Sequence, residues 1–343
     1  MGADLVTDDG FSDRHDPPPP PWERDEWPDA EAVASTRDRD AWLRARRPLL
    51  GASEVASVLG LSPWSPAIET WARKTTRYEE APDDVSEPMR IGNEIEPWLL
   101  GALERRTGCQ VQPAGRLMRS RRWPWLGATL DGTIEGRAGT PLAHVAGVRG
   151  AVEVKSAGGA FADQWQSASI GDAPALVPAW YLCQVDAQIA VTGAPYAVFG
   201  ALLGGRGFRF RWTIVERNEA RIAELVERTG AWWRAHVEAD VPPEPDGSER
   251  AADVLARLYP EAGGIVTLDE SAERDVEIAT AAREQIRALE AAKRAAEQRL
   301  RLAIGKASAG ELPHGGTVRL ATIQRKAYAV EAASYRRLTL PKE

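Results

Sequence analysis

An apolar run that holds two opposite charges constrains the fold of this chain more than any other feature. The segment AVEVKS begins at Ala151 and alternates as a β-strand does, so Glu153 and Lys155 share one face. Burying two opposite charges side by side usually costs more free energy than their attraction returns. A strand of this kind therefore needs a further charged partner, and the rest of the sequence offers candidates.

Two more carboxylates lie upstream, each at the boundary of an apolar segment. Asp131 ends the apolar strand of LGATLDG, and Glu96 lies beside the apolar positions of a predicted amphipathic helix, where an unpaired carboxylate is costly. A hard divalent cation, Mg²⁺ or Mn²⁺ as its substitute, would hold Glu96, Asp131 and Glu153 ionised. Such a cation also binds phosphate oxygens, and Lys155 could neutralise the charge that develops there. The set suits phosphodiester hydrolysis.

Each of these features has an ordinary structural explanation when taken alone. A Glu-x-Lys strand is usually a cross-strand ion pair, and an Asp-Gly step after a strand is usually a turn. The four histidines lie outside these motifs, and the chain has neither a Walker-type phosphate loop nor a serine nucleophile elbow. The order and spacing of the carboxylates therefore carry the prediction.

The net charge of −7 does not argue against a nucleic-acid partner, because the acidity is confined to the N-terminus. Residues 1–40 contain 12 acidic and 4 basic side chains, whereas the remaining residues contain 38 acidic and 39 basic ones (50 − 12 and 43 − 4). The body of the chain is thus nearly neutral, and its basic side chains cluster. One cluster is Arg44, Arg46 and Arg47, and another is Arg116, Arg119, Arg121 and Arg122. We expect these arginines to contact the DNA backbone, with a solvated surface as the alternative.

Composition and periodicity divide the chain into three parts. We predict a disordered, acidic, Pro-rich leader over residues 1–36, a first domain over 37–245 and a C-terminal extension over 246–343. In the first domain we expect helices over 51–60, from 66, over 87–107, before Gly193 and over 218–240. We expect an antiparallel sheet from 111–120, 125–136 and 150–156, with strands at 196–205 and 208–216. The extension is predicted to contain a long helix over 269–304, whose heptad-like seam includes Ile286, Leu289 and Leu300, and a small hairpin or strand pair over 315–330.

Several motifs together resemble one nuclease family. The order of helix Glu, strand Asp and Glu-x-Lys resembles the PD-(D/E)xK superfamily, with Leu130 in place of its usual proline. The segments GASEVASVLGLSPWSPAIETWARKT, GNEIEPWLL and WYLCQVDAQIAVTG are similar to motifs of the YqaJ-type viral recombinase nucleases, relatives of phage lambda exonuclease. The resemblance extends from about Ala41 to Asp240. It implies an α/β (α+β) fold with a restriction-endonuclease-like core, in which helices flank a mixed central β-sheet.

The resemblance also implies roles for individual residues. Glu96, Asp131 and Glu153 would bind the metal, with the Val154 carbonyl as a further ligand, and Lys155 would be the catalytic lysine. Gln184 would lie against the active site, whereas Asp186 replaces a second family glutamine. Arg46 and Ser53 would hold a terminal 5′-phosphate, and Thr129 would place a hydroxyl nearby. A guanidinium and a hydroxyl at a helix start are suitable groups for such a phosphate.

The resemblance favours a Mg²⁺-dependent exonuclease that degrades double-stranded DNA ends 5′→3′ and leaves 3′ single-stranded tails for phage-type recombination. It implies a single-strand annealing recombinase as partner and a homo-oligomer, a trimer by analogy. One alternative is an endonuclease or nickase in defence or replication, and another is a non-catalytic DNA-end binding module. Lacking a signal peptide or membrane span, and with two cysteines, the chain is expected in the cytoplasm.

Overall fold

The computed structural model describes residues 27–75, 77, 87–158, 177–204, 207–261 and 263–324. The chain divides into two compact units, Met1–Leu258 and Tyr259–Glu343. The predicted boundary at residue 245 therefore falls before helix α8 (Glu249–Leu258), which belongs to the first unit. In α8, Ala251 and Val254 are buried against Trp71 of helix α3 (Ala67–Lys74). This apolar contact is nonlocal in sequence, which explains why composition placed the boundary too early.

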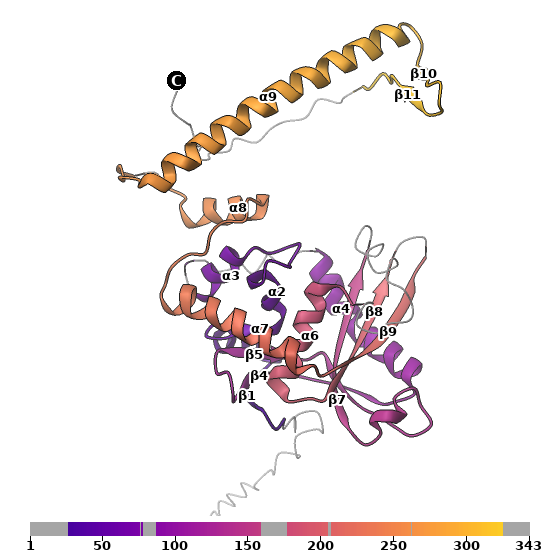
Figure 1. Ribbon diagram of the computed structural model, residues 1–343. Helices are drawn as coiled ribbons and strands as arrows, with labels where there is room; N and C mark the ends of the chain where they lie inside the picture. The colour runs from indigo at the N-terminus through magenta and orange to yellow at the C-terminus, as the bar shows by residue number, and fades with distance from the viewer. Residues whose placement is uncertain are drawn as a thin grey trace, which may run out of the picture. The chain divides into compact units, whose positions relative to one another are not determined.

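Two mixed β-sheets form the framework of the first unit (Figure 1). The larger has the order β3-β6-β7-β8-β9, and only its β7–β8 pair is parallel. Its strands are β3 (Val111–Pro113), β6 (Gly132–Glu135), β7 (Arg149–Ala157), β8 (Tyr196–Leu203) and β9 (Arg209–Glu216). The smaller has the order β1-β4-β5-β2, and its strands are β1 (Ala30–Ser35), β4 (Arg116–Ser120), β5 (Leu126–Thr129) and β2 (Leu50–Gly51).

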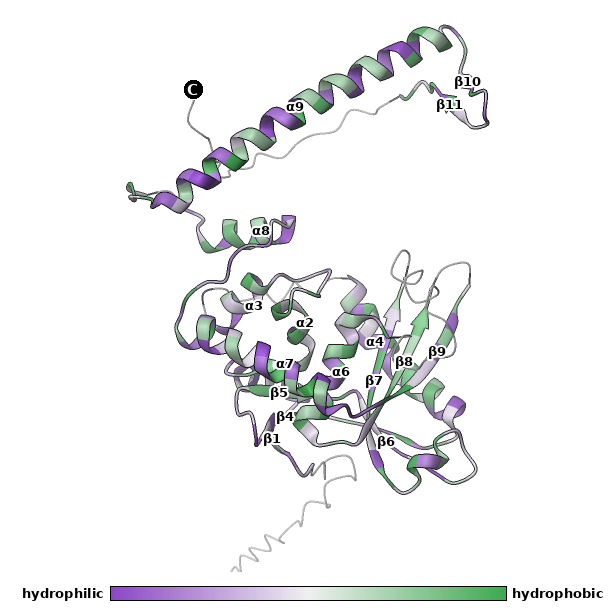
Figure 2. Ribbon diagram, viewed as in Figure 1, coloured by the Kyte–Doolittle hydropathy of each residue, from purple (hydrophilic) through white to green (hydrophobic). Residues whose placement is uncertain are grey.

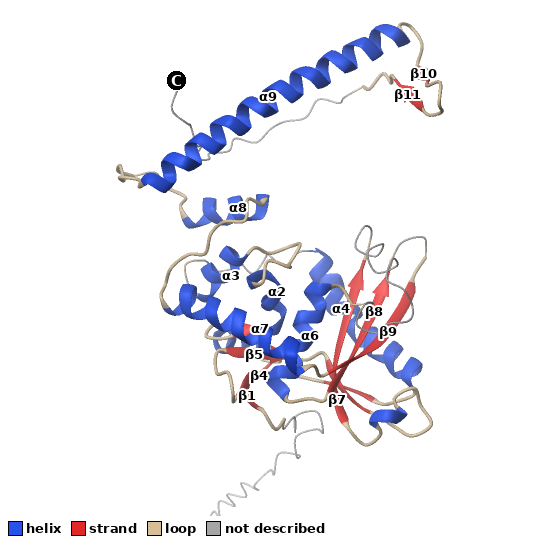
Figure 3. Cartoon of the chain, in the orientation of Figure 1, coloured by secondary structure: helices blue, strands red, loops and turns tan. Residues whose placement is uncertain are grey.

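Two helices cover opposite faces of the five-stranded sheet. Alternate residues of β7 belong to different cores: Ala151 packs with helix α6 (Ala179–Thr192), whereas Val152 packs with helix α4 (Glu87–Thr107). Strand β8 is buried on both faces and is hydrophobic along most of its length (Figure 2). The predicted α/β (α+β) class, with a mixed central sheet flanked by helices, is confirmed by this arrangement (Figure 3).

The helices with clear apolar periodicity occur where the sequence predicts them. Helix α4 spans Glu87–Thr107 and ends at Gly108, and α6 ends at Gly193; both glycines have a positive φ, which a Cβ would disfavour. The first unit also contains α1 (Arg39–Arg46), α2 (Val55–Val58) and α7 (Glu219–Trp232). A 3-10 turn over Ala52–Glu54 precedes α2, and a π-helical turn over Trp233–Glu238 continues α7.

The strand predictions need two corrections. The segment 111–136 does not form one antiparallel sheet with β7, because the chain crosses from the smaller sheet to the larger one between β5 and β6. Part of the predicted leader is also ordered: β1 pairs with β4 and Trp27 is buried. Helix α1 is capped by Asp38, whose side chain accepts the Ala41 N–H. Residues 1–26 lie outside the described part of the chain.

The second unit consists of a long helix and a small hairpin. Helix α9 (Glu270–Ile304) has no buried residue, and its predicted seam includes the exposed Ile286, Leu289 and Leu300. The hairpin pairs β10 (Ala309–Glu311) with β11 (Thr317–Arg319), so its first strand begins earlier than predicted. Residues 325–330, predicted to belong to it, lie outside the described ranges. Among the helices that the structure describes, none combines the length and apolar character needed to cross a membrane.

Candidate active site

The candidate site lies where strand β7 extends beyond its neighbour β6. Pairing between these strands begins at Gly132 and Val152, so Glu153 and Lys155 lie beyond the start of β6. Asp131 occupies the link between β5 and β6, and its carboxylate accepts the Val154 N–H at 2.8 Å. This hydrogen bond satisfies the Val154 N–H, which lies beyond the residues of β7 that pair with β6. It therefore brings Asp131 to the strand that carries Glu153 and Lys155.

The Glu153 carboxylate is buried and has a hydrogen-bond donor on each oxygen. Lys155 and Gln184 Nε2 donate to Oε1, the latter at 2.5 Å, and Gln188 Nε2 donates to Oε2, also at 2.5 Å. Gln184 and Gln188 are four residues apart on α6, so they lie on one helix face. Helix α6 therefore fixes both oxygens of Glu153, and the pair that the alternation predicts is a direct contact.

The charges at this site interact strongly. Burial raises the pKa of Asp131 well above its ordinary value, and the neighbouring Glu153 carboxylate raises it further, against the effect of Lys155. Burial and Glu153 also raise the pKa of Glu96. Burial by itself lowers the pKa of Lys155, but the attraction of Glu153 and Asp131 outweighs it and the pKa is raised. Lys155 is thus a protonated ammonium group at neutral pH.

The carboxylates of Glu96, Asp131 and Glu153 interact through their charges, but they are not arranged as a complete set of metal ligands. Within the described ranges, no group of three or more His, Cys, Asp or Glu side chains is placed to hold a metal ion. Glu96 comes from α4, on the opposite face of the sheet from Gln184, and interacts with Glu153 and Lys155 through their charges. Burial and the neighbouring Glu153 raise the pKa values of Glu96 and Asp131, and a cation would offset the repulsion between these carboxyl groups.

The residues predicted to hold a 5′-phosphate also come together. Arg46 Nη2 donates to Ser53 Oγ at 2.8 Å, and the Arg46 guanidinium lies 4.9 Å from the centre of the Trp42 ring. Trp42 Nε1 donates in turn to Thr129 Oγ1 at 3.3 Å, while the Thr129 carbonyl accepts from Gln188 Nε2 at 3.3 Å. A chain of contacts therefore joins the residues predicted to bind the 5′-phosphate to Glu153.

A buried ion pair holds the Arg46 side of this chain in place. Lys74 Nζ lies 2.7 Å from Glu54 Oε2, which also accepts the Gly51 N–H at 2.7 Å. Arg46 Nη2 lies 3.4 Å from Glu54 Oε1. Burial by itself raises the pKa of Glu54, but Lys74, Arg46 and the Gly51 N–H outweigh it and lower the pKa to about 2. Glu54 is therefore ionised at neutral pH and orients Arg46 beside Ser53.

The other predicted DNA-binding arginines are not gathered at this site. Arg119 pairs with Glu31, and Arg121 donates to the Ala30 carbonyl at 3.1 Å, so both support strand β1. Arg44 and Arg47 are exposed on or beside α1. DNA binding by these arginines stays a prediction.

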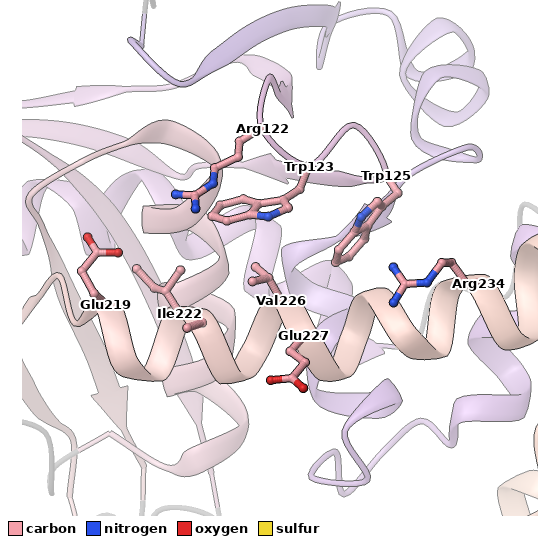
Figure 4. Close-up of a pocket in the computed structure, with 9 residues that line it drawn as sticks. Arg122, Trp123, Trp125, Glu219, Ile222, Val226, Glu227 and Arg234 are labelled. Atoms are coloured by element: carbon pink, nitrogen blue, oxygen red, sulfur yellow. The ribbon is translucent and has the colours of Figure 1, made fainter.

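Arg122 lines a cavity of about 310 Å³ beside helix α7. Figure 4 shows Trp123 and Trp125 on one side of the cavity and Ile222 and Val226 of α7 on the other. Arg122 also lies over the Trp123 ring, with 4.7 Å from the guanidinium carbon to the ring centre. None of the predicted catalytic residues lines this cavity.

The sequence analysis missed Gln188, although its spacing offered a signal. Gln188 is four residues after Gln184, and this period places both on one helix face. Its Oε1 is buried without a hydrogen-bond partner among the described atoms. Asp186 lies elsewhere on α6 and forms a bidentate ion pair with Arg221 of α7, at 2.8 and 2.9 Å. Asp186 is thus a structural residue that fixes α7 against α6.

Comparison with known proteins finds a similarity in the part of the chain that contains this site. Residues 41–195 match the model of the YqaJ-like viral recombinase domain. This match agrees with the family that the sequence motifs resemble. The matched segment includes Arg46, Glu96, Asp131, Glu153 and Gln188.

Individual relatives give weaker similarities. The chain is 27% identical over 236 residues to the uncharacterized protein YqaJ of Bacillus subtilis (strain 168), covering 68% of this chain and 67% of that protein. An alkaline exonuclease (LHK-Exo) from Laribacter hongkongensis is 22% identical, with a TM-score of 0.44 over 59% of this chain and 94% of its own. A phage related exonuclease from Haemophilus somnus 129PT is 12% identical, with a TM-score of 0.35. The match covers 56% of this chain and 95% of that one.

Proposed function

We propose that this protein is a metal-dependent deoxyribonuclease of phage-type recombination, acting 5′→3′ on double-stranded DNA ends. The observation that carries the proposal is the junction of Asp131, Glu153 and Lys155 at the exposed end of β7, inside the segment that matches the YqaJ-like domain. A permanently charged lysine beside clustered carboxylates suits a reaction that places extra negative charge on a phosphate. The protonated Lys155 would stabilise that charge, because its raised pKa prevents it from acting as a base.

Mg²⁺, or Mn²⁺ in its place, is the cofactor that we propose. The donor set fits, because carboxylate and carbonyl oxygens are the ligands that both ions prefer. Glu96, Asp131 and Glu153 would hold the ion with the Val154 carbonyl, and the ion would supply Lewis-acid activation of the phosphate. Burial and repulsion by Glu153 raise the pKa values of Glu96 and Asp131, and a cation would offset the repulsion, which supports this assignment. Gln184 and Gln188 would keep Glu153 oriented toward the ion.

A terminal 5′-phosphate is the group that we propose for Arg46 and Ser53. Their side chains already share a hydrogen bond, and a phosphate could replace it with contacts to both. Trp42 and Thr129 connect this pair to the carboxylate cluster. An enzyme that grips the terminal phosphate next to its reacting groups would release nucleotides from the 5′ end and leave a 3′ single-stranded tail.

The proposal is tested by incubating the full chain with Mg²⁺ and linear duplex DNA labelled at one 5′ end, with a closed circular duplex beside it. We expect early release of 5′ mononucleotides, an intact circle and no reaction in EDTA. Asp131→Asn should abolish cleavage and retain binding, whereas the surface control Glu224→Gln should behave as wild type. Cleavage of the circle would establish an endonuclease or nickase instead. Binding without cleavage in both Mg²⁺ and Mn²⁺ would establish an end-binding module.

The proposal extends to partners and location. A nuclease that makes 3′ tails needs a single-strand annealing recombinase to use them, and a homo-oligomer such as a trimer would keep the nuclease on the DNA. The cytoplasm of a bacterial host is where both would act. Sedimentation of the full chain and co-purification with a single-strand annealing protein would test these statements.

A further inference from the structure

An aromatic cluster lies directly beside the candidate catalytic lysine. Lys155 Nζ is 5.8 Å from the centre of the Tyr181 ring. The Tyr181 ring is 5.9 Å from Trp180 and 5.8 Å from Trp64, and Trp64 meets Trp180 edge to face at 6.0 Å. Trp180 and Tyr181 open helix α6, and Trp180 is four residues before Gln184 and eight before Gln188. The helix that fixes Glu153 therefore also carries two of the three aromatic rings.

Trp64 is 47% exposed and lies in a turn with a restrained backbone. It stands between Pro63 and Pro66, whose rings restrict the backbone. Ser62 Oγ accepts the N–H of Trp64 at 3.2 Å and that of Ser65 at 3.1 Å. A restrained backbone has less conformational entropy to lose on binding, which favours recognition by the exposed ring.

The cluster leaves one aromatic surface uncovered. Trp64 meets Trp180 edge to face, and part of the Trp64 ring stays in solvent.

We propose that Trp64, Trp180 and Tyr181 form a subsite that stacks an unpaired nucleobase of the DNA strand being cleaved. The inference rests on the proposed function, because it assigns the substrate of the same site. Aromatic side chains bind bases of any sequence, since every base offers a π-face. The cluster begins 5.8 Å from Lys155, so a base stacked here would belong to a nucleotide close to the reacting phosphate. Stacking would compensate for the base pairing that is lost when a duplex end opens.

The test uses the full chain in EDTA, with 5′-phosphorylated duplexes carrying the fluorescent base 2-aminopurine at the first, second or third nucleotide. Stacking on an aromatic ring quenches this base. We expect quenching at one position with wild type, its loss in Trp64→Ala and its retention in Trp64→Phe. Affinity for a frayed end should fall about 5- to 100-fold in Trp64→Ala. Trp98→Ala is the matched control, because Trp98 is also an exposed tryptophan, at 53%.

Three further measurements separate the explanations. Circular dichroism of each variant shows whether it folds, and Trp64→Phe keeps the test valid if Trp64→Ala does not. With an abasic nucleotide at the quenched position, wild type and Trp64→Ala should bind equally. Equal quenching and affinity in wild type, Trp64→Ala and Trp98→Ala would overturn the subsite. Cleavage in Mg²⁺ is measured in parallel: a cleaving enzyme without stacking refutes only the subsite, and stacking without cleavage refutes only the nuclease.

Discussion

Replacing Glu54 by glutamine tests how the buried ion pair supports the phosphate-binding side of the site. Glu54 has 10% of its side chain exposed, and Lys74 has 3%. Lowering the pKa of Glu54 from 4.5 to about 2 corresponds to about 3 kcal/mol of folding free energy, since one pKa unit is worth about 1.4 kcal/mol. Burial lowers the pKa of Lys74, so its desolvation reduces the net contribution of the pair at neutral pH.

The pH dependence isolates the contribution of Glu54. Because its pKa is lower in the folded protein than in the unfolded chain, its stabilisation is complete above about pH 5 and is lost as the pH falls toward 2. The difference in unfolding free energy between wild type and Glu54→Gln should therefore fall by about 3 kcal/mol between pH 6 and pH 2.

Urea unfolding followed by circular dichroism at several pH values measures this difference. Glu224→Gln is the control, because Glu224 forms an exposed pair with Arg228 that should contribute at most about 0.5 kcal/mol at any pH. A difference between wild type and Glu54→Gln that stays constant from pH 6 to pH 3 would refute the reasoning.

Four further predictions follow from single contacts. Gly150→Ala should destabilise the protein by about 1 to 3 kcal/mol in urea unfolding, because a Cβ there would lie 2.3 Å from the Tyr196 ring. Unchanged stability would mean that the ring moves freely. Arg221→Met should cost about 2 to 3 kcal/mol, since it leaves the buried Asp186 without its partner; the double variant with Asp186→Leu should recover part of that loss. Gln188→Leu should slow cleavage about 10- to 100-fold with DNA affinity unchanged, because one Glu153 oxygen loses its donor. A parallel loss of affinity would assign Gln188 to DNA binding instead. Arg46→Ala should weaken binding of 5′-phosphorylated ends about 10- to 100-fold relative to hydroxyl ends in a competition assay, and equal weakening of both would contradict the phosphate role.

Local patterns predicted the parts of the site that depend on one element. Alternation placed Glu153 and Lys155 on one face of β7, and the 3.6-residue period placed Glu96 on α4. The same period would also have found Gln188 from Gln184. The assignment of 111–136 to one sheet failed because strand periodicity records which face a residue occupies and not which strand it pairs with.

The sequence by itself indicated most element types and placed Glu153 and Lys155 on one strand face. These features depend on residue type and on spacing within one segment, and both can be read from the chain directly. Only the tertiary structure decided that β1 joins the smaller sheet, that Glu54 pairs with Lys74, and that Trp64 packs beside Tyr181. Each of these contacts joins segments far apart in sequence, and its partner is selected by the shape and charge of the folded core, which no local pattern encodes.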